Sequence, residues 1–268
     1  MKKVKYVYVI LIYRNTSDLV ECLASIKETV DSCAVVVVNA FYSKETDLVV
    51  KQITEQYQCD LINVENKGYS FGNNVGIDFA RKNFIFEYVI ISNPDIIISK
   101  FNDSALISIP KPAIIAPKIT AASGRLQNPM SIRYYKVSDY LEYVGFKKDL
   151  RILLYIGILI SKFQRALWSF LFKIRNKSIY RIYAAHGSHV ILSKEAVEKL
   201  WPVYDENIFL FAEEGVLAIK AKRMCIPTYY YDGIQIMHKE DGSMKLSALS
   251  VNNELKKANI YYYETYVK

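Results

Sequence analysis

The stretch EYVIISNPDIIIS, at residues 87–99, decides the predicted fold. Residues 88–91 form a continuous run of β-branched and aromatic residues, the pattern of a strand buried on both faces of a sheet. Pro94 cannot donate a hydrogen bond to a neighbouring strand, so strand pairing is expected to end before it. Asp95 is therefore expected at the carboxyl end of a central strand, where open α/β sheets bind their ligands. For the Asn-Pro-Asp tripeptide alone, a capped turn is the simpler interpretation.

The composition is that of a globular protein with an anionic partner. The chain has 268 residues, enough for one large α/β domain or two small ones. Hydrophobic residues make up 51% and charged residues 23%, which excludes a disordered chain. The net charge of +8 suits a nucleic acid, an acidic membrane face or a phosphorylated small molecule. The four cysteines are scattered without CxxC spacing, which predicts reduced thiols in a cytosolic protein and no zinc site.

Strands and helices are predicted to alternate in the first third of the chain. Buried strands are expected at residues 5–13, 34–38, 61–64 and 88–91, with amphipathic helices between them at 19–30, 44–58 and from Asn73 or Asn74 to Lys82. This βαβαβ order predicts a parallel, doubly wound sheet with right-handed crossovers. Residues 4–13 contain Lys5 and are far too short to span a bilayer, so we interpret them as a first strand and not as a signal sequence.

An Asn- and Gly-rich segment, NKGYSFGNNVGI at residues 66–77, precedes the third of these helices. A Gly-rich turn before a helix N-terminus favours an anionic group, because free backbone N–H groups and the helix dipole converge there. The segment is neither GxGxxG nor a Walker loop, and a tight loop that needs a positive φ is an equal alternative. The helix leads into residues 88–91, so we expect this loop and Asp95 at the same edge of the sheet.

Residues 140–183 interrupt the alternation. Residues 152–160 are apolar throughout but too short to cross a bilayer. Beyond them, one predicted helix face carries Phe163, Ala166, Leu167, Phe170, Leu171 and Ile174, and the other carries Lys162, Arg165, Ser169 and Lys173. Between residues 147 and 181 the only acid is Asp149. This pattern favours a helix in the plane of an anionic membrane, with Trp168 near the interface. A basic helical hairpin packed on the core is the alternative.

The second half carries two further candidate sites. Strands are predicted at residues 113–116, 190–192, 228–231 and 234–238, helices at 194–200 and 216–223, and a Tyr-rich helical tail at 246–268. Glu213 and Glu214 follow an apolar segment and precede the second of these helices. A helix N-terminus stabilises a carboxylate anion and apolar surroundings raise its pKa, so a cap and a general base are both possible. His238 ends the last strand, where a lone histidine is more often structural.

From residue 4 to about residue 243 the sequence resembles the inverting family-2 glycosyltransferases with the GT-A fold, in particular the rhamnosyltransferase-like enzymes of bacterial surface polysaccharide assembly. The segments that carry the resemblance occur in the family's order and are IYRN at 12–15, the 66–77 segment, NPD at 93–95, Gly187-Ser188, FLFAEE at 209–214 and HKEDGS at 238–243. The resemblance implies a single GT-A domain over residues 1–268, an α/β fold with a Rossmann-like, mostly parallel mixed sheet flanked by helices. Residues 140–180 are then a basic amphipathic helical insertion.

The resemblance also implies roles for individual residues. Asp95 and His238 would bind Mg²⁺ or Mn²⁺, which neutralises the leaving diphosphate. Glu214 would be the catalytic base that takes the acceptor proton, with Glu213 as the fallback. Nucleotide-sugar binding falls to Tyr13, Asn15, Asn39, Lys67, Gly72, Asn73, Asn74, Asn93, Asp95, Gly187 and Ser188. Two departures from the family are an Asn at position 39, where many relatives have a base-reading Asp, and a Glu in place of an Asp as the base.

The implied function is the transfer of rhamnose or another hexose from a dTDP- or UDP-sugar to a lipid-linked or oligosaccharide acceptor. The implied location is cytoplasmic, peripheral at the inner face of the plasma membrane, with an anionic membrane surface as a partner. The alternative is a non-catalytic, membrane-docked member that binds a nucleotide sugar or a partner protein. A nucleic-acid binder is disfavoured, because the basic residues lie beside apolar helical faces and no base-stacking or groove-reading motif is present.

Overall fold

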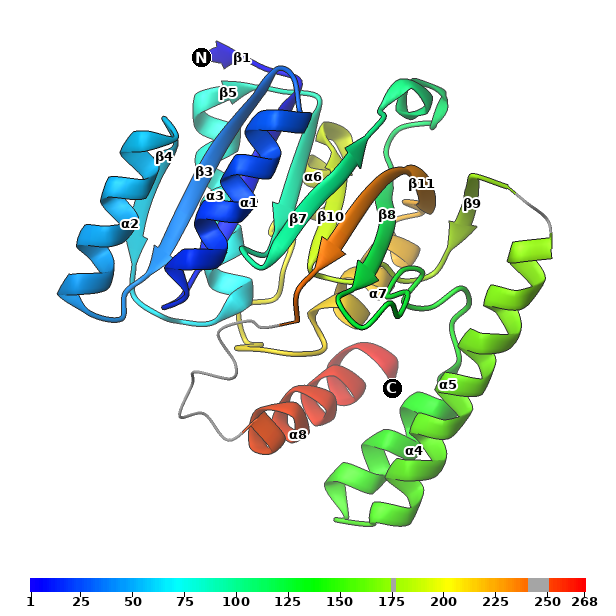
Figure 1. The fold of residues 1–268 in the computed structure, drawn as a ribbon. Coiled ribbons are helices and arrows are strands. Elements are labelled where there is room, and N and C mark those ends of the chain that lie inside the picture. Colours follow the sequence, from blue (N-terminus) through cyan, green and yellow to red (C-terminus); the bar gives the residue numbers. More distant parts are fainter. Residues whose placement is uncertain (175–176, 241–250) are drawn as a thin grey trace.

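The computed structural model describes residues 1–174, 177–240 and 251–268, without the side chains of residues 169 and 172–174. Among these residues a nine-stranded sheet has the strand order β4-β3-β2-β6-β10-β8-β11-β7, and β9 also pairs with β11. Helices cover both faces of this curled sheet (Figure 1). The predicted α/β fold, with a mixed sheet flanked by helices, is confirmed.

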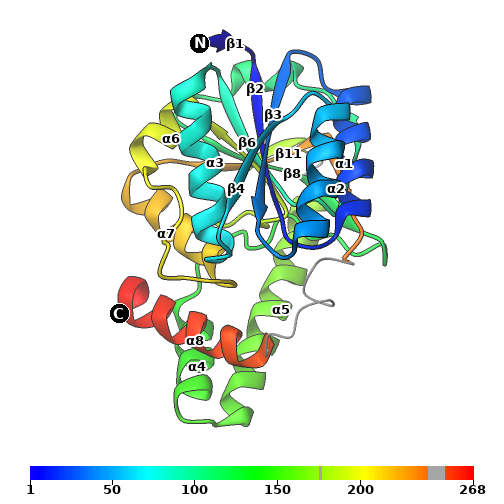
Figure 2. The same ribbon diagram turned by 90° about the vertical axis from the view of Figure 1, so that its left-hand side faces the viewer.

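The first half of the chain builds the parallel part of the sheet. Its strands are β2 (Tyr6–Ile12), β3 (Cys33–Ala40), β4 (Asp60–Val64) and β6 (Tyr88–Ser92), and its helices are α1 (Thr16–Thr29), α2 (Lys44–Gln56) and α3 (Tyr69–Asn83). The predicted strands are confirmed to within two residues at each end. Helices α1 and α2 cover one face and α3 covers the other (Figure 2). Both faces of β2 and β6 are therefore buried, which explains their continuous apolar sequences. A small separate sheet pairs β1 (Lys2–Lys3) with β5 (Phe84–Ile85).

The second half adds strands that are mostly antiparallel. They are β7 (Ile96–Phe101), β8 (Ile114–Ala121), β9 (Ile179–Ile182), β10 (His189–Ser193) and β11 (Thr228–His238), with the helices α6 (Lys194–Leu200) and α7 (Glu213–Arg223). A 3₁₀ helix (Ser104–Ser108) precedes β8. The strands predicted at 228–231 and 234–238 form one strand, β11, whose pairing register shifts between Tyr231 and Gln235. Strands β7 and β9 have no predicted counterpart, because each pairs with β11, which is not its neighbour in the sequence.

The predicted insertion forms a helical hairpin that projects from the sheet (Figure 1). Helix α4 (Lys136–Lys147) packs along α5 (Arg151–Ile174), and a Cβ atom at Gly157 would lie 2.7 Å from Cγ of Glu142. Helix α8 (Val251–Tyr262) and the π-helical turn Tyr263–Val267 pack on α4 and α7. Residues 246–250 of the predicted tail lie outside the described residues. Across the described helices, none is both long and apolar enough to span a bilayer.

Glycines determine how α3 sits on the sheet. A Cβ atom at Gly72 would lie 2.4 Å from a Leu11 methyl group, and one at Gly76 would lie 2.3 Å from Val9. Gly68 precedes the helix with φ of +99°, and a Cβ there would meet the Phe209 backbone. The helix begins directly after Gly68, so Asn73 and Asn74 lie inside it, and the predicted N-cap at these residues is wrong. The glycines of this segment are explained by backbone conformation and close packing.

Asn74 fastens α3 to a segment from the second half of the chain. Its side-chain amide donates to the carbonyl of Tyr204 and to Oε1 of Glu206, both at 2.9 Å. Its Oδ1 accepts the Tyr204 N–H at 3.1 Å. Only 3% of Asn74 is exposed, so these hydrogen bonds satisfy groups that water does not reach.

Replacing Asn74 tests this role. We expect Asn74→Ala to lower the free energy of unfolding by at least about 2 kcal/mol, because each buried group left unpaired costs about 1–3 kcal/mol. Asn83→Ala is the matched control in the same helix, since the exposed Asn83 amide bonds only the Phe79 carbonyl. We expect that variant to stay within about 0.5 kcal/mol of wild type. Equal losses in the two variants, measured by chemical denaturation, would contradict the structural role of Asn74.

Candidate active site

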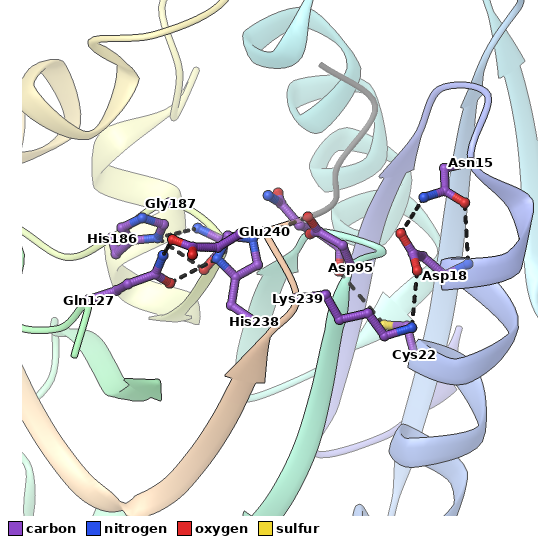
Figure 3. A network of polar contacts seen from close by, with 12 residues as sticks. Asn15, Asp18, Cys22, Asp95, Gln127, His186, Gly187, His238, Lys239 and Glu240 are labelled. Carbon is purple, nitrogen blue, oxygen red and sulfur yellow. Dashed lines mark hydrogen bonds and ion pairs between the residues drawn. The ribbon is translucent and has the colours of Figure 1, made fainter. Parts of the chain in front are cut away.

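Asp95 and His238 come together from the two halves of the chain. Asp95 directly precedes β7, and the antiparallel pairing of β7 with β11 places His238 opposite Ile96. The His238 Nε2 atom lies 3.2 Å from Asp95 Oδ2, and the two side chains are only 10% and 5% exposed (Figure 3). The other carboxylate oxygen, Asp95 Oδ1, is buried and has no hydrogen-bond partner among the described residues. The predicted pairing of these two residues at one site is thus realised in the geometry.

Gln127 determines which nitrogen of His238 carries the proton. The Gln127 Oε1 atom lies 2.8 Å from His238 Nδ1, while Gln127 Nε2 donates to Glu240 Oε1 at 2.8 Å. Arg125 donates to the same Glu240 oxygen at 2.7 Å. Because Gln127 turns its oxygen toward His238, the imidazole donates from Nδ1 and directs Nε2 at the Asp95 carboxylate. In the neutral imidazole Nε2 is an acceptor, so a cation placed between Nε2 and the carboxylate would meet two acceptors.

Lys239 ties this pair to α1. Its backbone N–H donates to the Asp95 carbonyl at 2.9 Å. Its Nζ lies 3.0 Å from Asp18 Oδ1 and 2.7 Å from Glu21 Oε2 (Figure 3). Asn15, predicted to bind the nucleotide, is the N-cap of α1 and hydrogen-bonds to Asp18. These contacts fix the end of β11 against the helix that follows β2.

The residues directly before β10, His186 to Ser188, connect the Asp95–His238 pair to the carboxyl groups of Glu213 and Glu214. The His186 ring lies 5.7 Å from the His238 ring, and the Gly187 N–H donates to Glu214 Oε1 at 3.2 Å. A Cβ at Gly187 would lie 3.0 Å from that oxygen, so a larger residue would require the Glu214 carboxylate to shift slightly. The Ser188 carbonyl accepts the Asn93 N–H at 2.8 Å, two residues before Asp95. Burial, with the nearby His238, lowers the pKa of His186 to about 4, which leaves its imidazole neutral at neutral pH.

Glu213 and Glu214 occupy the first turn of α7 in different surroundings. Glu213 is 8% exposed and its Oε2 is buried without a partner in the described structure, whereas Glu214 is half-buried. Burial, together with the charge of Glu214, raises the pKa of Glu213 well above its ordinary value. Burial also raises the pKa of Glu214. Glu214 is the more accessible of the two carboxyl groups and is the one that touches Gly187.

Aromatic side chains gather where β2 and β3 end. The rings of Tyr13 and Tyr42 are 5.7 Å apart, and the Arg14 guanidinium lies 3.9 Å from the Tyr42 ring centre. Tyr42 is 46% exposed, as is the neighbouring Phe41 at 48%. The sequence did not single out Tyr42 or Phe41, although their position directly after a buried strand was a usable signal. They form an exposed aromatic surface at the ligand-binding edge of the sheet.

Other residues predicted to bind the nucleotide sugar donate hydrogen bonds elsewhere in the fold or lie at its surface. The Oδ1 atoms of Asn39 and Asn73 are buried without a partner among the described residues. Asn39 is fully buried, and its amide donates to Asp47 at 2.6 Å and to Asn63 at 3.1 Å. The buried Asn73 amide donates to the Tyr69 carbonyl. Lys67 is exposed and pairs with Glu65 at 3.2 Å. The structure thus gathers Asn93, Asp95, Gly187, Ser188, Glu213, Glu214 and His238 at one place, and it does not bring Asn39, Lys67, Gly72, Asn73 or Asn74 into that group.

The residues available for a cation are few. Within the described ranges, no group of three or more His, Cys, Asp or Glu side chains is arranged to hold a metal ion. Asp95 and His238 therefore offer a two-ligand site, and residues 241–243 of the predicted closing motif lie outside the described residues. Divalent cations that bind phosphorylated substrates often take only one or two protein ligands. The arrangement suits a cation whose remaining ligands come from a substrate and water.

Comparisons with known proteins now identify the fold. Neither a protein-family model nor a curated protein matches the sequence. The structure is similar to that of GalNAc-T7 with UDP, GalNAc and Mn²⁺, with a TM-score of 0.59 and 13% identity over 88% of this chain and 44% of that one. It is also similar to the mannosyltransferase PcManGT from Pyrobaculum calidifontis in complex with GDP-Man and Mn²⁺, with a TM-score of 0.53 and 13% identity over 99% of this chain and 71% of that one.

S. aureus TarS is a third similar structure, with a TM-score of 0.51 and 14% identity over 85% of this chain and 36% of that one. This chain spans less than half of the GalNAc-T7 and TarS chains. At such low identity the similarity establishes the fold alone. The predicted GT-A fold is confirmed.

The buried Glu213 carboxyl predicts a pH-dependent effect on stability. Because its pKa is raised in the folded protein, the native state keeps a proton that the unfolded chain releases above about pH 4.5. Stability contributed by this proton is present at low pH and is lost as the pH rises toward the folded pKa. Glu213→Gln carries no such proton, so we expect the variant to gain stability over wild type progressively from pH 5 to pH 8.

The measurement is denaturant unfolding at several pH values, with Glu28→Gln at an exposed position as the matched control. The wild-type and Glu213→Gln curves should converge near pH 4. A difference that stays constant from pH 4 to pH 8 would contradict a buried, protonated Glu213.

Proposed function

We propose that this chain is a metal-dependent glycosyltransferase that moves a sugar from a nucleotide-linked donor to an acceptor hydroxyl. The observation that carries the proposal is the continuous contact from Asp95 and His238 through His186 and Gly187 to Glu214. This arrangement lies at the ligand-binding edge of a GT-A sheet. GalNAc-T7 with UDP, GalNAc and Mn²⁺, and PcManGT with GDP-Man and Mn²⁺, support it as proteins of the same fold.

The Asp95–His238 pair fits Mg²⁺ or Mn²⁺. Two acceptors that face each other at 3.2 Å, and a buried carboxylate oxygen without a partner, are both satisfied by a cation. A bound divalent cation supplies positive charge for the diphosphate that leaves. Gln127 and Lys239 hold the two ligands in place from outside, as partners of this kind do in other metal sites.

Glu214 is the proposed general base. It is half-buried, whereas Glu213 is shielded, so an acceptor hydroxyl can approach Glu214. Burial raises its pKa, which favours uptake of the acceptor proton. In a single displacement the acceptor oxygen bonds to the anomeric carbon while the nucleoside diphosphate leaves, and the acceptor proton passes to Glu214. The configuration at the anomeric carbon is thereby inverted. Gly187 orients the carboxylate through its N–H.

The donor is proposed to be a dTDP- or UDP-linked hexose such as rhamnose. The half-buried Tyr13 ring and the exposed Tyr42 ring offer aromatic surface for the nucleobase at the ends of β2 and β3. Asn93, between them and the acidic pair, would lie near the ribose. The acceptor would be a lipid-linked or oligosaccharide chain of a bacterial surface polysaccharide, met at the cytoplasmic face of the plasma membrane.

Turnover measurements test the roles of the two acidic sites. We expect wild type to release nucleoside diphosphate from one member of a nucleotide-sugar panel with Mn²⁺. Glu214→Gln should lower kcat by about 10²–10⁴-fold, the usual contribution of a general base. Asp95→Ala should lose activity as well, while Glu213→Gln, the matched control, should retain most of it. Equal activity in wild type, Asp95→Ala and Glu214→Gln would refute these roles.

The same panel tests the non-catalytic alternative. A ligand that binds only the native state raises the melting temperature, so a thermal shift with UDP or dTDP detects binding without turnover. Binding by wild type with no release from any donor would favour a nucleotide-sugar-binding protein over an enzyme.

Gln127 is expected to act on the metal through His238. Gln127→Leu removes the acceptor that keeps the His238 proton on Nδ1, so we expect Mn²⁺ affinity to fall about 10–100-fold, as for other residues behind metal ligands. The measurement is Mn²⁺ titration by electron paramagnetic resonance with UDP present and no acceptor. Gln52→Leu, at an exposed position on α2, is the control. Unchanged Mn²⁺ affinity in Gln127→Leu would contradict the positioning role.

A further inference from the structure

Helix α5 exposes an apolar stripe along almost its whole length. Its members are between 39% and 75% exposed and are Ile152, Tyr155, Ile156, Leu159, Phe163, Leu167, Phe170 and Leu171. Their spacing of three and four residues places them on one face of the helix. At 1.5 Å per residue the stripe is about 30 Å long. A continuous exposed apolar surface of this size marks an interaction site.

The stripe is not needed to hold the hairpin together. The other side of α5 makes the contacts to α4, where Leu154 fills the space beside Gly145 and the Ser161 hydroxyl donates to Glu142. Trp168, expected near a membrane interface, instead packs against the core and under the Arg133 guanidinium at 4.0 Å. The amphipathic character predicted for this helix is therefore present, but Trp168 belongs to its inner face.

The charges of α5 favour an anionic occupant. Arg151 and Lys162 are exposed beside the stripe. Helix α5 contains four Lys and Arg residues and no Asp or Glu. If a second copy of the chain packed α5 against α5, Arg151 and Lys162 would meet a helix that has no acid to pair with them. Lipid headgroups of negative charge satisfy them, while the apolar stripe enters the acyl boundary.

The inner side of the same helix reaches toward the candidate active site. Arg165 is half-buried and makes no ion pair with any residue that the structure describes. Burial, and after it the charge of Arg125, lowers the pKa of Arg165, and Arg165 also contributes to the lowered pKa of His186. Residue 165 lies opposite the stripe on the helix, so α5 carries the apolar stripe on one side and a half-buried basic side chain, whose charge acts on His186, on the other.

We propose that the stripe, with Arg151 and Lys162, docks α5 in the plane of an anionic membrane surface, so that the site serves an acceptor held in that membrane. The membrane docking is inferred from the exposed apolar stripe and from the basic residues beside it. The acceptor class rests on the proposed function, and it selects the lipid-linked acceptor over the oligosaccharide in solution.

Vesicle flotation of the full chain tests the docking. We expect recovery with vesicles of phosphatidylcholine and phosphatidylglycerol, and much weaker recovery with phosphatidylcholine alone or in high salt. The double variant Leu159→Glu/Phe163→Glu should lose most of the recovery while its thermal unfolding stays near wild type, because both side chains are exposed. Leu48→Glu, at a position 64% exposed on α2, is the control and should float like wild type. The proposal would be overturned if wild type did not float with the anionic vesicles. It would also be overturned if analytical ultracentrifugation showed a dimer for wild type and a monomer for the double variant.

A second assay separates the acceptor from the docking. Nucleoside diphosphate release is compared with a polyprenyl-diphosphate-linked sugar in the same vesicles and with the same sugar as a soluble glycoside. We expect the vesicle-held acceptor to be preferred by wild type and the preference to disappear in Leu159→Glu/Phe163→Glu, with turnover of the soluble glycoside unchanged. Equal use of both acceptors by wild type would overturn the membrane-held acceptor. No release from any donor would refute the proposed function, while flotation would still decide the docking.

Discussion

The pairing of β11 with β7 is the constraint on which the candidate site depends. Asp95 and His238 are far apart in the sequence, and only this antiparallel pairing, with His238 opposite Ile96, places them side by side. Successive side chains of a strand point to opposite faces, so a slip of one residue would turn His238 away from Asp95. Lys239 holds this register with its backbone and with its side chain. Its N–H donates to the Asp95 carbonyl, and its Nζ forms ion pairs with Asp18 and Glu21.

The sequence predicted the first half of the fold well because its signals are local. Strands β2, β3, β4 and β6 are continuous apolar runs separated by amphipathic helices. Strands β3 and β4 each pair with the strand before them, and β6 pairs with β2 on its other side. Strand β7 has an equally apolar start, but its partner is 140 residues away, so no local pattern marks it as paired. The role of Gln127 was not predicted from the sequence for the same reason. Its role exists only once β11 brings His238 beside it.

The same contrast holds among the predicted ligand-binding residues. Asp95, His238, Gly187 and Glu214 converge as the resemblance implied, since the strands and helix that carry them end at one edge of the sheet. Polar residues inside or beside α3 and β3 do not join them. Asn74 and Asn39 have the residue type of a ligand-binding site, but tertiary contacts commit their amides to Tyr204, Asp47 and neighbouring groups. Residue type and order along the chain cannot distinguish a residue of the candidate site from one that bonds elsewhere in the fold, because the difference lies in which group the side chain contacts.

Among the residues that the structure describes, the proposed cation site has two protein ligands, and this has a consequence for how the cation and the donor would bind. Asp95 and His238 leave most positions around a divalent cation unfilled, and cations of this kind take six or more ligands. Under the proposed function the diphosphate of the donor fills part of this deficit, so each partner improves the affinity of the other by the same factor. A third carboxylate would hold the cation more tightly by itself, but it would compete with the phosphate for the same positions. Under the proposed function, the incomplete ligand set would make tight cation binding depend on the bound donor. Gln127 and Lys239 would hold His238 and Asp95 in place before the cation and the donor bind.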